Sequence, residues 1–101
     1  MYVVLLNYVV SLEEIDLLLP DHVEWLEKHF AAGEFLMAGR RNPRVGGVII
    51  TRPMLRGKLD TILATDPFKI NHVATYEVVE FAATRTAPEL FMLNEAPSAT
   101  G

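Results

Sequence analysis

The chain turns at Ala64-Thr65-Asp66-Pro67-Phe68-Lys69-Ile70-Asn71-His72, between the end of an expected helix and the start of the expected last strand. Asp66 stands directly before Pro67. An aspartate in that position suits a helix N-cap, because proline biases the preceding residue away from helical angles and is well tolerated at the first helical position. The turn therefore predicts a helix cap, which needs no function to explain it.

A histidine far upstream gives Asp66 a second interpretation. His22 has leucines nearby in the sequence rather than a solvated run, and an aspartate with a histidine makes a proton-transfer pair. If Pro20 opens a helical segment, His22 lies in its first turn, where the helix dipole disfavours the imidazolium and keeps a neutral base available. The competing interpretation is that His22 is a half-buried helix residue and that Asp66 is only a cap.

The first third of the chain predicts a strand followed by a helix. Tyr2 to Val10 is rich in β-branched and aromatic residues, and both of its alternating sets are mostly apolar. Ser11 and Glu14 have the spacing of a capping box, so a helix is expected to begin there. Pro20 is expected to interrupt it and to open a second segment from Pro20 to Ala32. The apolar stripe of that segment, expected to face the core, is Val23, Leu26 and Phe30.

The middle and end of the chain predict a hairpin, a helix and a last strand. Phe35 to Arg40 and Gly47 to Thr51 are two antiparallel strands joined by a short loop with Pro and Gly. Pro53 to Ala64 carries apolar residues at helical spacing, and His72 to Ala83 has the composition of a strand. The order β-α-β-β-α-β is a split βαβ arrangement, in which two helices cover one face of a four-stranded antiparallel sheet.

The other face of that sheet also needs cover, because the first strand is apolar on both sides and the last strand nearly so. A second copy is the simplest cover, so a homodimer, or a higher even oligomer, is expected. The chain is expected to be one domain over residues 1–101, with a core of about 2–84 and a C-terminal extension of 85–101. Leu90 to Leu93 is expected to dock because it is apolar, and the residues from Pro97 onward are expected to be unstructured.

Charge and composition exclude several partners and chemistries. A net charge of -4 and a pI of about 5.2 argue against nucleic acid or a membrane surface as the partner, since both are anionic. The chain has no cysteine, so disulfides, thiolate catalysis and a Cys-ligated zinc site are not available to it. Its opening apolar run is too short to span a bilayer and lacks a basic leader. A cytoplasmic protein is expected.

A metal centre or an organic cofactor is not predicted. His22 and His29 are one heptad apart, which is too far for two imidazoles to share an ion, and His72 adds no spacing motif. Nothing in the chain resembles a phosphate-binding loop, a dinucleotide fingerprint or a nucleophile elbow. Hydride, phosphoryl and covalent acyl chemistry are therefore disfavoured.

Basic residues gather in one part of an acidic chain. Six of the nine lie between Arg40 and Lys58, and a planar guanidinium matches a carboxylate or a phenolate. Arg40 and Arg44 are therefore candidates for orienting an anionic substrate, and Phe68 is a candidate aromatic contact for it. The alternative is a solvated hairpin whose charges discourage edge-to-edge association.

Several short segments, spread over roughly residues 2 to 82, together match the pattern of a known family. They are Tyr2 to Tyr8, His22, Gly33-Glu34-Phe35-Leu36, Ala38-Gly39, Gly47, Asp66-Pro67-Phe68 and Tyr76-Glu77-Val78. In this combination the chain resembles the YCII-related (YciI-like) family. The resemblance implies an α+β ferredoxin-like fold that pairs into a dimeric α/β barrel, with His22 and Asp66 as the active-site pair. One branch of that family eliminates chloride from a chlorinated hydroxyhydroquinone. This chain departs from the pattern at Arg40-Arg41, where many members have proline after Ala-Gly.

Two functions from different classes follow from these residues. The first is a small cofactor-independent enzyme that uses His22 and Asp66 for proton transfer, of elimination or isomerisation type, on a small anionic or phenolic molecule. The second is a non-catalytic homodimer that binds a small ligand or serves a structural role with the same residues.

Overall fold

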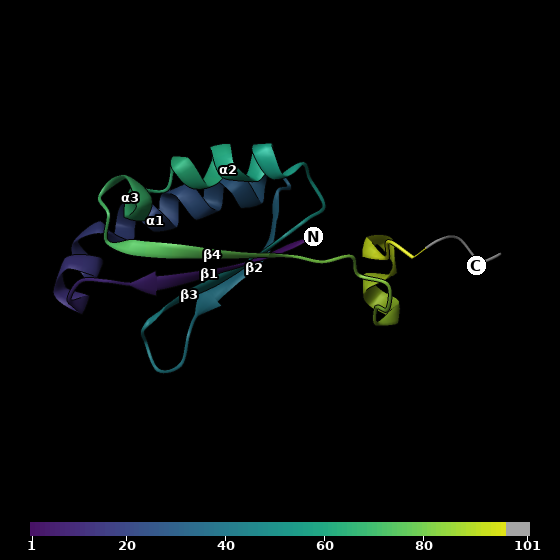
Figure 1. Ribbon diagram of the computed structural model, residues 1–101, viewed down its shortest axis with the longest axis horizontal. Coiled ribbons are helices and arrows are strands. Elements are labelled where there is room, and N and C mark those ends of the chain that lie inside the picture. Colours follow the sequence, from purple (N-terminus) through teal and green to yellow (C-terminus); the bar gives the residue numbers. More distant parts are fainter. Residues whose placement is uncertain (97–101) are drawn as a thin grey trace.

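The computed structural model describes residues 1–96 and has the predicted order of elements, with one short helix and a C-terminal turn added. The elements are β1 (Tyr2–Tyr8), α1 (Leu12–Ala31), β2 (Phe35–Arg40), β3 (Gly46–Thr51), α2 (Arg56–Ala64), α3 (Pro67–Ile70), β4 (Ala74–Glu80) and the 3₁₀ helix η1 (Pro88–Leu93). The four strands form one antiparallel sheet in the order β2-β3-β1-β4. The three α-helices lie on one side of this sheet (Figure 1). The predicted α+β, ferredoxin-like fold is confirmed.

The element bounds differ most around the two prolines that follow β3. The second helix begins at Arg56 rather than at Pro53, and the last strand begins at Ala74 rather than at His72. The later start of β4 has a local cause. Asp66 caps a short helix with Pro67 at its first position, as the turn predicts, and that helix uses the residues up to Ile70. His72 then adopts a φ of 56°, in the left-handed region common after a helix end.

The expected break of the first helix at Pro20 is wrong. α1 is continuous from Leu12 to Ala31, and Ser11 caps it through a hydrogen bond accepted from the amide of Glu14 at 3.4 Å. A proline inside a helix removes one hydrogen bond and bends the axis, and Figure 1 shows the first turns of α1 running at an angle to the rest. His22 therefore lies in the middle of a helix, and the argument from the helix dipole does not apply to it.

The buried face of α1 also differs from the predicted stripe. Its buried residues are Ile15, His22, Trp25 and His29. Of the predicted stripe, Leu26 is partly buried against the core, whereas Val23 and Phe30 are exposed. The buried residues of α1 pack toward a sheet face that presents Tyr2, Val4 and Leu6 of β1 and Ile49 of β3. The two histidines can occupy core positions because each is paired with a carboxylate, a partnership that hydrophobic periodicity does not register.

The opposite face of the sheet carries no helix among residues 1–96, and the C-terminal extension does not cover it. η1 has no buried residue, and Phe91 and Met92 are 73% and 75% exposed. Leu90 to Leu93 is predicted to dock, and within one chain this prediction is wrong for Phe91 and Met92. The expectation for the residues from Pro97 onward falls outside the described residues. No helix within residues 1–96 is long and apolar enough to cross a membrane.

Candidate active site

The carboxylate of Asp66 accepts hydrogen bonds from three different residues. Asp66 is completely buried at the start of α3, and its Oδ1 accepts a hydrogen bond from the amide of Phe68 at 3.0 Å. This contact closes the first turn of a helix that Pro67 has already set in the required conformation. The side chain is therefore held by contacts within its own turn, in addition to those from other elements.

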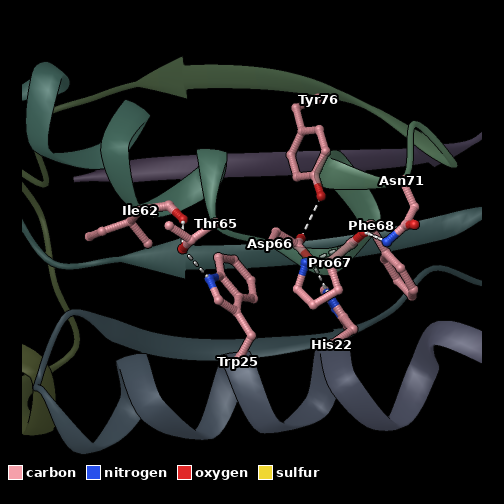
Figure 2. A network of polar contacts seen from close by, with 9 residues as sticks. All are labelled: His22, Trp25, Ile62, Thr65, Asp66, Pro67, Phe68, Asn71 and Tyr76. Atoms are coloured by element: carbon pink, nitrogen blue, oxygen red, sulfur yellow. Dashed lines mark hydrogen bonds and ion pairs between the residues drawn. The ribbon is translucent and has the colours of Figure 1, made fainter.

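His22 approaches the same oxygen from α1. Its Nδ1 lies 2.8 Å from Oδ1 of Asp66, and the histidine is 7% exposed. The ring of Phe68 stacks on the imidazole, with ring centroids 4.0 Å apart and an interplanar angle of 8°. Trp25 lies on the same face of α1 with its ring 5.6 Å from the imidazole. Two aromatic neighbours and one carboxylate thus hold the imidazole in a single orientation (Figure 2).

Tyr76 of β4 completes the environment of Asp66. Its phenol donates a hydrogen bond to Oδ2, so that Tyr76 and His22 reach the carboxylate from opposite sides (Figure 2). Burial, followed by the negative charge of Asp66, raises the pKa of Tyr76 far above its ordinary value of 10.0, and the phenol remains a donor. An ionised carboxylate that accepts from Tyr76 and Phe68 also accepts from His22, which places the imidazole proton on Nδ1. Nε2 is then the nitrogen with a free lone pair.

The sequence alone does not predict this contact between Tyr76 and Asp66. The signal that could have found it is strand alternation. Tyr76 is directly opposite Leu6 on β1, and both face the helices. A partly buried tyrosine that faces the helices needs a hydrogen-bond partner for its hydroxyl, and the turn with Asp66 comes directly before β4.

A cavity of about 290 Å³ lies between α1 and the sheet, on the side of β2 and β3. It is lined by Leu6, Tyr8, Leu19, His22, Val23, Leu26, Glu27, Phe30, Ala38, Gly39, Arg40, Gly47, Val48 and Ile49. The apolar residues predicted as the core stripe of α1 thus form one wall of this cavity. His22 is in its lining and Asp66 is not, so Asp66 contacts the cavity only through the imidazole.

The cavity includes one of the two predicted arginines. Arg40 is paired with Gly47, which is opposite Leu6, and its side chain therefore points to the side of the helices. Arg44 instead forms an ion pair with Asp16 of α1, which lowers the pKa of that carboxyl. Phe68 lies behind His22 rather than in the lining. His22, Asp66 and Phe68 are thus brought together, Arg40 joins them across the cavity, and Arg44 does not.

A second buried histidine has its own carboxylate. Nδ1 of His29 lies 2.6 Å from Oε1 of Glu34, and the hydrogen bond with His29, supported by Lys58 at 3.4 Å, lowers the pKa of Glu34. His29 is absent from the cavity lining and packs against Trp25 and Phe35. Among the described residues, no three His, Cys, Asp or Glu side chains gather in a way that could hold a metal ion.

The fold and this geometry define a class: a small ferredoxin-like domain with a buried His-Asp pair behind an apolar cavity. The chain belongs to the YCII-related domain family, whose model matches residues 1–82. A similar solved structure is the 5-chloro-2-hydroxyhydroquinone dehydrochlorinase TftG from Burkholderia phenoliruptrix AC1100, in complex with 2,5-dihydroxybenzoquinone. The TM-score is 0.67 at 15% identity, over 80% of this chain and 93% of that one, a likeness of fold. No curated protein matches the chain.

Proposed function

We propose that this protein is a cofactor-independent enzyme that transfers a proton to or from a small anionic or phenolic molecule, with His22 as the base and Asp66 as its positioning residue. The single observation that carries the proposal is the placement of the imidazole. Asp66 occupies Nδ1 at 2.8 Å, and His22 lines a cavity in which Nε2 can meet a ligand. A buried carboxylate behind the ring also stabilises the imidazolium that forms when Nε2 accepts a proton.

The lining of the cavity favours an aromatic molecule with one acidic group. Leu26, Phe30 and Ile49 offer apolar contacts, while Arg40 offers a guanidinium to an oxyanion. The fold neighbour is named as a dehydrochlorinase of a chlorinated hydroxyhydroquinone, which agrees with a ligand of this chemistry. We therefore propose hydroxylated aromatic compounds as the first substrates to test.

An elimination on such a substrate needs only the groups named above. Nε2 of His22 accepts a hydroxyl proton of the substrate and returns a proton to the ring carbon that carries the leaving group, so the hydroxyl becomes a carbonyl and that carbon becomes tetrahedral. Nε2 then accepts the proton of a second hydroxyl, whose O–H electron pair forms a second carbonyl. The ring electrons shift to the tetrahedral carbon, and a leaving anion such as chloride departs with the electron pair of its bond. In net the substrate loses one proton and one anion and becomes a quinone. No outside oxidant is needed, and the proton on His22 passes to solvent.

The test measures binding and turnover separately. Trp25 is the only tryptophan of the chain and stacks near His22, so its fluorescence reports binding of a quinone or hydroquinone in the cavity. The assay uses a chlorinated hydroxyhydroquinone as the test compound, and released chloride measures turnover. The variant His22→Asn should keep binding within about threefold and lose turnover by about 10²- to 10⁴-fold.

The outcomes separate the two classes of function. Binding by the native chain without chloride release or isomerisation would favour the ligand-binding homodimer over the enzyme. Turnover that persists in His22→Asn would exclude His22 as the base. Failure of hydroxylated aromatics to bind at all would remove the proposed substrate class.

A homodimer is part of the proposal. The face of the sheet opposite the helices presents Val3 and Leu5 of β1, and both are only half-buried within one chain. A second sheet stacked on this face would bury them. Sedimentation of the full chain tests this point independently of any activity.

A further inference from the structure

Residues 83–96, which include the described part of the C-terminal extension, lie beyond the matched family domain and present an apolar ridge formed by Phe91 and Met92. This segment contains η1, whose Phe91 and Met92 are among the most exposed large apolar side chains of the described chain. η1 lies past the end of β4 and apart from the three α-helices (Figure 1). Exposed apolar surface of this kind indicates a site of interaction with another protein surface.

The ridge is held in place by polar contacts at its base. The amide of Glu95 donates to the carbonyl of Ala83 at 2.8 Å, and the carboxylate of Glu95 accepts from the amide of Ala83 at 3.0 Å. The same carboxylate lies 3.6 Å from the N-terminal amine of Met1. These contacts tie the extension back to the start of β1 and the end of β4. The ridge is therefore preformed, which lowers the entropic cost of docking.

A groove of about 350 Å³ separates the ridge from the open face of the sheet. Leu90 and Leu93 form its wall on the side of the extension, and Met37, Ile50 and Phe81 form its wall on the side of the sheet. The ridge and the groove thus belong to one continuous apolar surface, and this surface lies on the face that carries no helix.

The surface is large enough for a specific interface. Its most exposed members are Met37, Val79, Phe81, Leu90, Phe91 and Met92. With roughly 200 Å² for each large side chain, their exposed parts total on the order of 600 Å². The half-buried residues of the open face add to this sum, which approaches the roughly 800 Å² that each partner buries in a specific complex.

Charge at the two edges of the open face favours a second copy as the occupant. Glu77, on edge strand β4, is opposite Leu5 and therefore on the open face. Arg41, at the end of edge strand β2, donates to the side chain of Asn7, which is on the same face. The register puts Glu77 level with Gly39, two residues from Arg41. A two-fold axis along the strands lays β4 of one copy over β2 of the other, so each Glu77 comes within reach of the long side chain of an Arg41. The same axis puts both extensions at one end of the dimer.

We propose that a second copy of this chain docks on the open face and that Phe91 and Met92 of each copy fill the groove of the other. The extension is thus an exchanged clasp that this chain adds to the family domain. The inference rests on the proposed homodimer and is independent of the proposed chemistry. It assigns Phe91 and Met92 to assembly.

The test is the dimer dissociation constant of the full chain, measured by sedimentation. The double variant Phe91→Ser/Met92→Ser should raise this constant at least about tenfold, because two large side chains lose their burial. Both residues are exposed in a single chain, so the variant should unfold at the same temperature as the native chain when both are diluted to monomers. The matched control is Leu17→Ser/Leu55→Ser, since these two leucines are 81% and 83% exposed on other surfaces. The control should leave the constant within about threefold.

Each outcome decides a different statement. A dimer whose dissociation constant is unchanged in Phe91→Ser/Met92→Ser would overturn the clasp and leave the homodimer standing. A native chain that stays monomeric would overturn both the clasp and the homodimer, and the ridge would then be assigned to binding a different protein. An equal effect in the variant and in the control would also overturn the clasp, because the loss would not depend on the ridge.

Discussion

Oδ1 of Asp66 lies 2.8 Å from Nδ1 of His22, and the same oxygen accepts the hydrogen bond of the Phe68 amide. The same oxygen atom therefore caps the helix and contacts the histidine. The structural and the catalytic interpretation of Asp66 are compatible with one geometry. Capping fixes the oxygen, and the fixed oxygen orients the imidazole. What separates a structural role from a chemical one is the response of activity to changes that keep the cap.

Replacing Asp66 in two ways separates these roles. Asp66→Asn should retain most of the stability, since asparagine caps a helix about as well as aspartate. Its turnover should still fall by about tenfold or more, because a neutral amide stabilises the imidazolium less well. Asp66→Ala should cost roughly 2 to 4 kcal/mol of unfolding free energy, since it removes the cap and leaves the hydroxyl of the partly buried Tyr76 without its acceptor. Urea unfolding and chloride release measure the two effects, and equal activity in Asp66→Asn and the native chain would restrict Asp66 to capping.

Tyr76→Phe tests whether the third contact of Asp66 matters for function. The variant keeps the ring and loses the hydrogen bond to Oδ2, so turnover should fall about tenfold as the carboxylate loses one of its fixed contacts. Tyr2→Phe is the matched control, because the buried Tyr2 donates its hydroxyl to the carbonyl of Met54 at 3.0 Å, away from the cavity. Both variants should lose about 1 kcal/mol of stability. A similar loss of turnover in both would mean that Tyr76 acts only through stability.

The sequence predicts the sheet well because its strands are apolar segments, and Pro and Gly residues mark the turn between two of them. The hairpin of β2 and β3 differs from its prediction by one residue, Gly46, and the Asp66 cap is correct. Both features are local, since a Pro and a Gly or an Asp before a Pro set the backbone with few distant contacts. His22 and Asp66 meet across 44 positions, and it was the family resemblance rather than any spacing rule that paired them.

The errors come from features that depend on tertiary packing. Pro20 predicts a break in the helix, but buried residues on both sides of it, Ile15 and Trp25, keep α1 continuous. The predicted core stripe does not include His22 and His29, and their carboxylate partners let them form the core face. Periodicity therefore assigns two exposed residues of α1, Val23 and Phe30, to the core.

Arg40 and Arg41 are neighbours that point to opposite sides of the sheet. Arg40 lines the cavity, whereas Arg41 donates to Asn7 on the open face. Arg40→Gln should weaken binding of an anionic hydroxyquinone by about tenfold or more, the value of a hydrogen bond to a charged group. Arg41→Gln should change it by about twofold or less. Titration followed by Trp25 fluorescence compares the two, and equal small effects would favour a solvated hairpin over an anion contact.

Glu34 gives the fold a pH dependence that is independent of the cavity. Its hydrogen bond with His29 holds the pKa of Glu34 below the ordinary value of 4.5, so its stabilising contribution is complete above that pH and is lost as the pH falls through the lower, folded pKa. Glu34→Gln should therefore be less stable than the native chain at about pH 7, by roughly 1 to 3 kcal/mol. The difference should shrink as the pH falls below 4.5.

Urea unfolding from about pH 7 to about pH 3 measures this difference in stability between the native chain and Glu34→Gln. Glu24→Gln, an exposed position on α1, is the control and should show no such trend. A native-minus-variant difference that stayed constant across this range would mean that the His29 and Glu34 contact contributes no charge-dependent stability.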